Sequence, residues 1–268
     1  MTHTQTTPEP ATSQAVKPKM LAQKILTRPP PFAADLLEKH LASNLKPTNN
    51  VELDASIAKK IHARINALAL VRGLRDAPEQ FKEFCPFWPM EPHVKQHHLV
   101  SETLGGASKL PVDPLTFRHK ASLNPFDFIS PVAEVEPSTV SEPEQTPSII
   151  DDAILKNTDD DAMTQIQYLG RSLCGHDGII HGGLLATIID EAFARLAFPF
   201  LPGYSGFTAN LNLNYRVPVP ADHVVVVTMK VDKLEGRKAF LTATMKSLDG
   251  NVQFLEATSL FIAPKPRE

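Results

Sequence analysis

Residues 183–198 have the periodicity of a helix, but apolar side chains cover far more of its circumference than the stripe of a surface helix. The apolar positions are Leu184, Leu185, Ile188, Ile189, Ala192, Phe193 and Leu196. A helix of this kind has to be buried, so the rest of the fold must enclose it. Asp190 projects away from the centre of the apolar sector, because successive residues are about 100° apart. Glu191 comes four residues before Arg195 and is expected to form an ion pair with it.

The segments that follow this helix have the two-residue period of β-strands. Within residues 207–217, one face is expected to carry Ala209, Leu211, Leu213, Tyr215 and Val217, and the other Thr208, Asn210, Asn212, Asn214 and Arg216. Further strands are expected at residues 165–173, 223–231, 238–247 and 252–262. Neighbours joined by short turns pair in antiparallel fashion, because parallel neighbours need long crossover connections. The sequence therefore predicts an α+β fold in which an antiparallel sheet wraps around one long central helix.

The first half of the chain contains two proline-rich segments. Residues 1–50 hold seven prolines and little apolar side-chain surface, which predicts a disordered tail. The basic part of this tail is also compatible with a transit region, so a mitochondrial and a cytoplasmic location both stay open. Residues 119–162 hold five prolines and ten acidic residues and are expected to form a solvated insertion.

Periodic patterns return between these two segments. A helix is expected at residues 54–75, where apolar residues recur at spacings of three and four, namely Ile57, Ile61, Ile65, Leu68 and Val71. A Gly105-Gly106 turn stands between short apolar runs within residues 102–117, which is typical of a small strand unit. We therefore expect an N-terminal helix and strand unit at residues 51–118 and the main globular domain at residues 163–268.

Composition and motifs exclude several classes of function. The net charge of −3 gives no reason to expect a nucleic-acid partner, and no apolar run is long enough for a transmembrane segment. Two cysteines are too few for a disulfide scaffold or a cysteine-built zinc site. The G-x-S-x-G elbow of serine hydrolases, the P-loop and the G-x-G-x-x-G fingerprint are absent from the sequence. We expect no metal and no cofactor.

His181, Gly182 and Gly183 lead directly into the apolar helix and carry the strongest chemical signal. Glycines at a helix start let a ligand approach backbone N–H groups that have no partner within the helix. These donors and the positive end of the helix dipole suit an oxygen that gains negative charge. Asp190 follows in the same helix, where a carboxylate is costly unless it is paired or used. Taken alone, these residues leave two interpretations open: a catalytic site, or a glycine-rich helix start with a structural Asp190.

The segment from His181 to Asp190 resembles the H-G-G-x-x-A-T-x-x-D signature of hotdog-fold acyl-CoA thioesterases of the PaaI-like branch. Three further blocks are similar to the vertebrate thioesterase superfamily members four and five, namely residues 208–216, 232–238 and 256–262. Residues 102–117 resemble the corresponding strand unit of fungal relatives. The resemblance covers about residues 164–264 and implies a hotdog fold. It also implies a homodimer or a dimer of dimers, with the active sites at the interface between copies.

The resemblance implies roles for individual residues. Asp190 matches the family's catalytic acid, with the general-base and nucleophile roles both open, and Thr208 matches its partner. The helix start formed by His181, Gly182 and Gly183 is expected to bind the oxyanion. The positions that contact the substrate, in particular its CoA part, are Asn214, Arg216, Arg237 and Thr242.

Gly175 departs from the family pattern, because many PaaI-like enzymes have an Asn six residues before the motif histidine. Positioning of the attacking water would then depend more on Thr208. The expected function is the hydrolysis of acyl-CoA thioesters, with medium- or long-chain fatty acyl-CoA as the substrate. One alternative is a non-catalytic acyl-CoA-binding or protein-interaction module with the same fold. Another is a hotdog dehydratase, although the hydratase-type segment of that branch is not found here.

Overall fold

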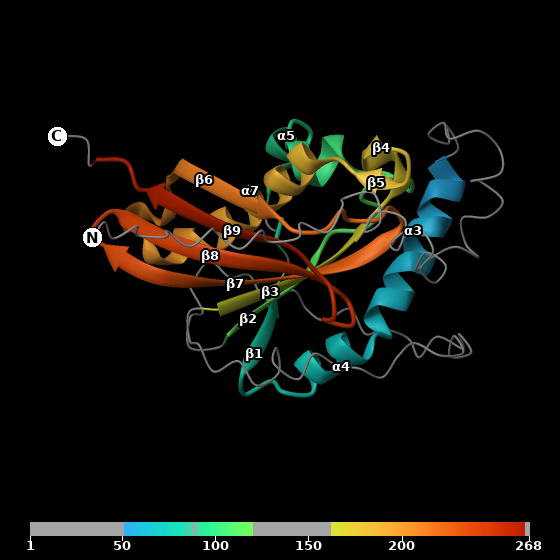
Figure 1. The fold of residues 1–268 in the computed structure, drawn as a ribbon, viewed down its shortest axis with the longest axis horizontal. Helices are drawn as coiled ribbons and strands as arrows, with labels where there is room; N and C mark the ends of the chain where they lie inside the picture. Colours follow the sequence, from blue (N-terminus) through green and yellow to red (C-terminus); the bar gives the residue numbers. More distant parts are fainter. Residues whose placement is uncertain (1–50, 85, 88–89, 120–161, 266–268) are drawn as a thin grey trace, which may run out of the picture.

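The computed structural model describes residues 51–265, apart from residue 85, residues 88–89 and residues 120–161 (Figure 1). The tail predicted at residues 1–50 lies outside the described residues, as does nearly all of the insertion predicted at residues 119–162.

One antiparallel sheet of seven strands organises the fold, in the order β1-β2-β3-β7-β8-β9-β6. The strands are β1 (Phe81–Phe84), β2 (Leu115–His119), β3 (Ala162–Leu169), β6 (Phe207–Tyr215), β7 (His223–Glu235), β8 (Lys238–Ser247) and β9 (Gln253–Ile262). The strands predicted after the helix are confirmed, but β6 pairs with β9 rather than with β7 and forms one edge of the sheet. A separate short hairpin consists of β4 (Cys174–His176) and β5 (Ile179–Ile180).

The strand predicted at residues 165–173 is shifted in the structure. β3 begins at Ala162 and ends at Leu169, and a 3-10 turn, η3 (Arg171–Leu173), follows it. The chain leaves the sheet at Gly170, because the Gly170 N–H donates to Lys109 O instead of continuing the ladder with β7. This turn redirects the chain toward the start of the long helix.

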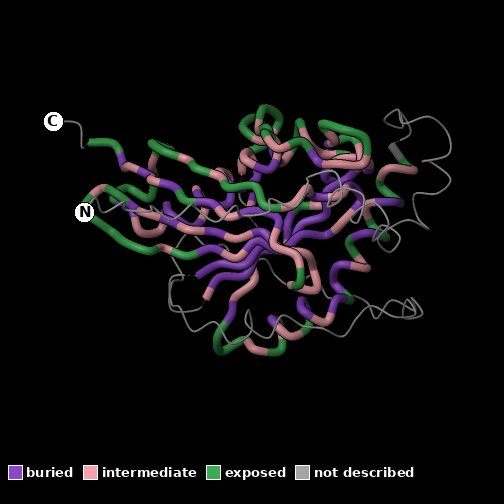
Figure 2. The backbone as a smooth tube through the Cα atoms, viewed as in Figure 1, coloured by how far each residue is buried: buried purple, intermediate pink, exposed green. Residues whose placement is uncertain are grey.

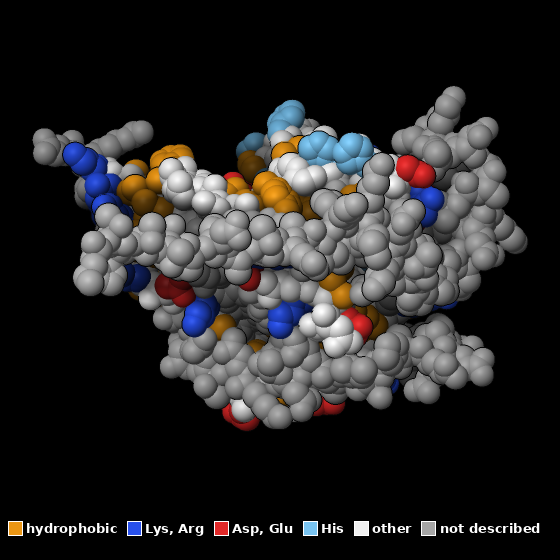
Figure 3. Space-filling model, viewed as in Figure 1, with side chains coloured by type: hydrophobic (Ala, Val, Ile, Leu, Met, Phe, Trp, Pro, Cys, Tyr) orange, Lys and Arg blue, Asp and Glu red, His pale blue; other side chains and the backbone are white. Residues whose placement is uncertain are grey.

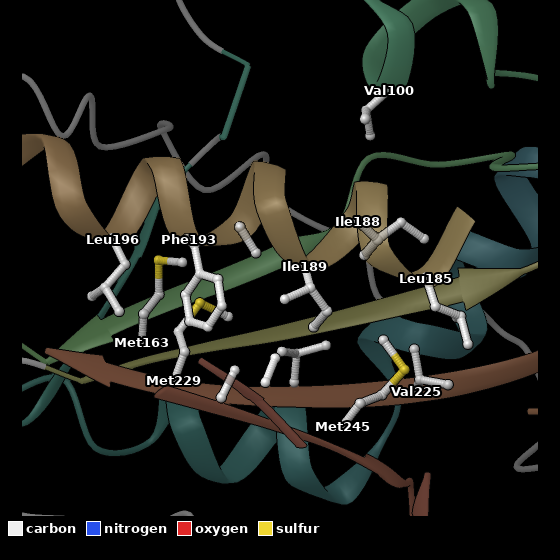
Figure 4. Packing of buried hydrophobic residues seen from close by; sticks show 14 of the residues in the cluster. Val100, Met163, Leu185, Ile188, Ile189, Phe193, Leu196, Val225, Met229 and Met245 are labelled. Carbon is white, nitrogen blue, oxygen red and sulfur yellow. The ribbon is translucent and has the colours of Figure 1, made fainter. Parts of the chain in front are cut away.

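The predicted long helix is α7 (Gly182–Ala197), and it packs against one face of the sheet (Figure 4). Leu185, Ile189 and Phe193 point from the helix toward the strands. Each of these three side chains is buried, and they share a core cluster with residues of β7, β8 and β9. Two 3-10 turns, η4 (Phe198–Phe200) and η5 (Pro202–Tyr204), connect the helix to β6. The predicted antiparallel sheet around one long helix is therefore confirmed.

Two helices cover the opposite face of the sheet, α3 (Val51–Asn66) and α4 (Ala69–Arg75). The predicted stripe of Ile57, Ile61, Ile65, Leu68 and Val71 is buried. It forms a second core cluster with Phe117, Ile166, Tyr168, Val224 and Val226 from β2, β3 and β7. The single helix expected at residues 54–75 is interrupted where Leu68 adopts an extended conformation before α4. The chain changes direction at this interruption, between the 16-residue α3 and the 7-residue α4 (Figure 1).

The small strand unit expected at residues 102–117 is only partly present. β2 is a strand, but its partners are β1 and β3, and the segment before it begins with the π-helix η1 (Leu99–Thr103). Gly105 and Leu110 form only an isolated bridge. The apolar side chains of Leu104 and Leu110 pack into the core around α7 instead of forming a hairpin. Burial of these side chains therefore overrides the local turn signal.

The N-terminal part of the chain also reaches the outer side of α7. In Figure 4, Val100 of η1 lies on the side of the helix that faces away from the sheet. A short helix, α5 (Pro92–Lys95), precedes η1. The helix is thus covered by the sheet on one side and by η1 on another. Figure 2 shows buried residues running through the central strands, whereas most of β6 is exposed.

Candidate active site

Thr208 and Asp190 form a direct hydrogen bond beside the edge of the sheet. The Thr208 Oγ1 hydroxyl donates to Asp190 Oδ1 over 2.8 Å, which joins β6 to the middle of α7. Both side chains are accessible to solvent in the single chain. A carboxylate held by a hydroxyl on an open surface can accept a proton from a bound water. The structure therefore brings together the two residues expected to carry the chemistry.

A β-bulge makes this contact possible. The register between β6 and β9 shifts between Thr208 and Asn210, so Thr208 pairs with Phe261 and Asn210 pairs with Leu260. Phe261 belongs to the core around α7, which shows that Thr208 faces the helix. The expectation that Thr208 shares a face with Asn210, Asn212 and Asn214 is therefore wrong. The extra residue of the bulge reverses the alternation at this point.

His181 caps the start of α7. Its backbone is extended and its Nδ1 accepts a hydrogen bond of 2.9 Å from the Gly183 N–H. A neutral imidazole that accepts at Nδ1 carries its proton on Nε2. The Gly183 N–H is consequently engaged within the chain, whereas the Gly182 N–H lies in the first turn, where the helix offers no acceptor. The Gly182 N–H is then one of the first-turn backbone donors that this geometry leaves for an oxyanion.

The glycines around His181 make room for its ring. A Cβ atom added at Gly183 would lie 2.9 Å from His181 Cε1, and one added at Gly175 would lie 2.8 Å from His181 Cδ2. Such approaches are far shorter than ordinary carbon contacts. Gly175 therefore permits the capping position of His181, and any larger side chain there would have to displace the ring.

The four residues expected to contact CoA are not gathered in one place in the single chain. Arg216 follows β6, where its backbone N–H donates to Phe254 O and its side chain binds Glu256 over 2.7 Å. Arg237 donates to Ala263 O over 2.5 Å, and Thr242 donates to Asp232 over 3.1 Å. Asn214 is exposed and pairs across the strands with Glu256. Phe254 lies at the start of β9, and Ala263 follows its last residue, so the two partners lie at opposite ends of this strand. Arg216 and Arg237 thus lie far apart in one copy of the chain.

The pairing of Arg216 with Glu256 affects the charge state of that carboxyl group. The pKa of Glu256 is lowered, first by the hydrogen bond from Arg216 and then by the hydrogen bond from Gln253. The carboxylate is therefore charged at neutral pH. A phosphate group that binds Arg216 would have to compete with Glu256 for the guanidinium.

The helix is also fixed from the side of the N-terminal segment. The predicted Glu191–Arg195 pair is present, with Arg195 Nη2 donating to Glu191 Oε1 over 2.7 Å. Arg195 Nε donates to Pro86 O, and its guanidinium lies 4.4 Å from the centre of the Phe87 ring. His98 Nε2 is 3.5 Å from Glu191 Oε1. These contacts position the turn of α7 that follows Asp190.

A buried network that the sequence analysis missed holds the segment leading to His181. Asp222 is 1% exposed, has a φ of 57°, and accepts hydrogen bonds from Tyr168 Oη and Arg171 Nε. Burial raises the pKa of Tyr168. The His181 N–H donates to Leu173 O, close to Arg171 in the chain. The signal in the sequence is weak, because an isolated Asp before a strand is also a common turn residue.

No group of metal-ligating side chains comes together in the described part of the chain. Among the helices that the structure describes, none has the length and apolar character needed to cross a membrane.

Comparison with known proteins identifies the domain. The thioesterase superfamily profile matches residues 177–253. The acyl-coenzyme A thioesterase THEM4 of Bos taurus is 41% identical over 115 residues, which cover 43% of this chain and 46% of that protein. A Candida albicans (strain WO-1) protein, named uncharacterized and mitochondrial, is 30% identical over 121 residues, which cover 43% of this chain and 54% of that protein. The chain thus spans about half the length of these curated relatives.

A solved structure gives a weaker likeness. A hypothetical thioesterase of Streptococcus pneumoniae TIGR4 with coenzyme A aligns over 42% of this chain and 86% of its own, at 18% sequence identity and a TM-score of 0.37. Because this score is low, the assignment rests on the sheet and helix of the chain itself and on the family match. Residues 177–253, which include α7 and strands β6, β7 and β8, are a thioesterase-superfamily match, and the sheet and helix of the chain have the hotdog arrangement.

Proposed function

We propose that the protein hydrolyses acyl-CoA thioesters to a free acid and CoA. The observation that carries the proposal is the hydrogen bond between Thr208 and Asp190, on a helix that begins with His181 and two glycines. The relative from Bos taurus is named an acyl-coenzyme A thioesterase, which supports the same substrate class. Medium- or long-chain fatty acyl-CoA remains the proposed substrate.

The geometry supports a simple division of tasks. The Gly182 N–H and the positive end of α7 polarise the thioester carbonyl, an effect for which loss of one donor costs about 3–4 kcal/mol in known enzymes. Asp190 takes a proton from water as the water oxygen attacks the carbonyl carbon, or it attacks the carbon directly to give a mixed anhydride, which water then hydrolyses to the free acid and the Asp190 carboxylate. Thr208 orients the carboxylate. The carbon–sulfur bond then breaks, and CoA leaves as a thiolate, which the ordinary thiol pKa of about 8.5 makes a good leaving group.

A second copy of the chain is part of the proposal. β6 is an edge strand, and edge strands present unpaired backbone N–H and C=O groups. Phe207 is 69% exposed, and Tyr204 and Tyr215 are also exposed. Figure 3 shows hydrophobic side chains at the surface of the region where Figure 1 places β6. Antiparallel pairing of β6 with β6 of another copy would extend the sheet and cover the Thr208–Asp190 pair. It would also bring Arg216 of one copy toward the end of the sheet where the other copy holds Arg237.

A non-catalytic acyl-CoA-binding module is the second candidate. It is favoured by the engagement of the Gly183 N–H with His181 and by Gly175 in place of the Asn, since both features remove donors from the carbonyl site. Turnover and binding, measured together on the purified full-length protein, distinguish the two candidates. A panel of acyl-CoAs of increasing chain length is assayed for release of free thiol and, in parallel, for binding by calorimetry.

Turnover on at least one chain length supports the thioesterase. Binding without turnover across the whole panel supports the second candidate, and neither binding nor turnover contradicts both. The mitochondrial name of the Candida albicans relative favours a mitochondrial over a cytoplasmic location, which fractionation of cells expressing the full chain would test.

A further inference from the structure

Tyr215 connects the end of β6 to the first turn of α7. Its hydroxyl donates to Gly182 O over 2.7 Å, and its ring lies beside Gly182, where an added Cβ would meet ring atoms at 3.6 Å. We propose that Tyr215 is a positioning residue: by holding the Gly182 carbonyl it fixes the first turn of α7, which carries the Gly182 N–H that would face the substrate carbonyl. The catalytic part of this inference rests on the proposed thioesterase function.

The Gly182–Gly183 peptide is held at both of its polar ends. Gly182 O and the Gly183 N–H belong to one planar peptide unit. Tyr215 donates to the oxygen, and His181 Nδ1 accepts from the N–H. Two consecutive glycines have wide conformational freedom, so a helix start built from them needs such contacts to keep one orientation. Loss of either contact leaves this peptide with one side-chain partner fewer, so the first turn of α7 should open more easily.

The bulge in β6 is what allows one strand to hold both parts of the site. Thr208 and Tyr215 are an odd number of residues apart, so in a regular strand they would face opposite sides of the sheet. The register shift between Thr208 and Asn210 adds one residue and turns both side chains toward α7. Thr208 then bonds the carboxylate of Asp190, and Tyr215 bonds the helix start. β6 therefore sets the position of the carboxylate relative to the proposed oxyanion donor.

The hydroxyl can be removed without a large effect on the core. Tyr215 is 53% exposed, and neither core cluster includes it. Burial of its hydroxyl raises the pKa of Tyr215, so the group remains protonated and able to donate at neutral pH. Tyr215→Phe keeps the ring beside Gly182 and deletes only the donor.

The test compares Tyr215→Phe with Thr228→Val. Thr228 of β7 also loses one hydroxyl hydrogen bond, to Thr244 of β8 over 2.9 Å, but its side chain faces away from α7. Three quantities are measured on each full-length variant: kcat and KM on an acyl-CoA that the wild type hydrolyses, the mass in solution, and hydrogen exchange of a peptide spanning residues 179–187. Misplacement of a group by about 1 Å can cost about a hundredfold in rate, so a partial misalignment should lower kcat by about tenfold or more.

We expect Tyr215→Phe to lower kcat with little change in KM or mass, and to speed exchange at the start of α7. Thr228→Val should leave both kcat and this exchange unchanged. Wild-type kcat and exchange in Tyr215→Phe would overturn the inference. A fall in kcat that is explained by dissociation of the oligomer would overturn it as well, because the residue would then serve the interface.

The exchange measurement separates this inference from the proposed function. If the wild type hydrolyses no acyl-CoA, the thioesterase proposal fails. Faster exchange at the start of α7 in Tyr215→Phe would still show that the hydroxyl fixes the Gly182–Gly183 peptide, and unchanged exchange would show that it does not.

Discussion

Arg195 joins the N-terminal segment to the helix that carries Asp190, so its removal should lower the free energy of unfolding of the domain. Arg195→Met removes the hydrogen bonds to Pro86 O and Glu191 O, the position over the Phe87 ring and the pair with the Glu191 carboxylate. Hydrogen bonds to charged groups contribute about 1.5 kcal/mol, cation–π contacts about 0.5–1 kcal/mol and i,i+4 ion pairs about 0.3–0.5 kcal/mol. We therefore expect a loss of about 2–3 kcal/mol.

Thermal unfolding measures this loss. For a domain of this size, 1 kcal/mol corresponds to about 2–4 °C, so Arg195→Met should lower Tm by about 4–12 °C. The methionine keeps an apolar stem of similar length, which limits the change to the polar head group. Arg72→Met is the matched control, because Arg72 is an exposed residue of α4. If both variants unfold within about 0.5 kcal/mol of the wild type, the ordinary range for surface substitutions, then Arg195 does not anchor the segment.

Three further predictions address the interface, the partly desolvated His62 of α3 and the tail. Phe207→Glu should convert the proposed β6-paired dimer to a folded monomer without turnover, as checked by sedimentation and a thiol-release assay; an active monomer would contradict the proposed interface. Burial, and then Arg75, lower the pKa of His62 below 6.5, so its contribution to stability is present above pH 6.5 and is lost as the pH falls through the lowered value. In denaturant unfolding, His62→Gln should therefore lose less stability than the wild type as the pH falls over this range. The same pH dependence of stability in both proteins would contradict this role of His62. Deletion of residues 1–50 leaves every contact described above in place, so Tm and kcat should be unchanged, and a marked fall in Tm would show that the tail is structural.

Local patterns predicted the elements whose burial follows a simple period. The apolar residues of α7 are buried between the sheet and η1, as their helical spacing predicted. The stripe from Ile57 to Val71 also has helical spacing, and it packs against the opposite face of the sheet. The Glu191–Arg195 pair is likewise fixed by helix geometry alone. The same logic identified the strands after α7.

Features that depend on partners distant in the sequence were not predictable in this way. The bulge that turns Thr208 toward Asp190 follows from the pairing of β6 with β9. The residue pattern within β6 did not predict this bulge. β1 is a strand because β2 lies beside it, and four residues are too few to show a period. The capping of Gly183 by His181 depends on the space that Gly175 provides from another segment. The candidate residues could be named from the sequence, but their mutual contacts could not.

The most direct test of the proposed chemistry is the turnover of Asp190→Asn in the folded oligomer. An asparagine keeps the size of the side chain and an oxygen that can accept from Thr208, but it cannot take a proton from water or attack the thioester. We expect turnover to fall at least about a hundredfold, with substrate binding little changed and stability equal or higher, since a partly buried charge is removed. Wild-type turnover in a well-folded Asp190→Asn oligomer would contradict the account.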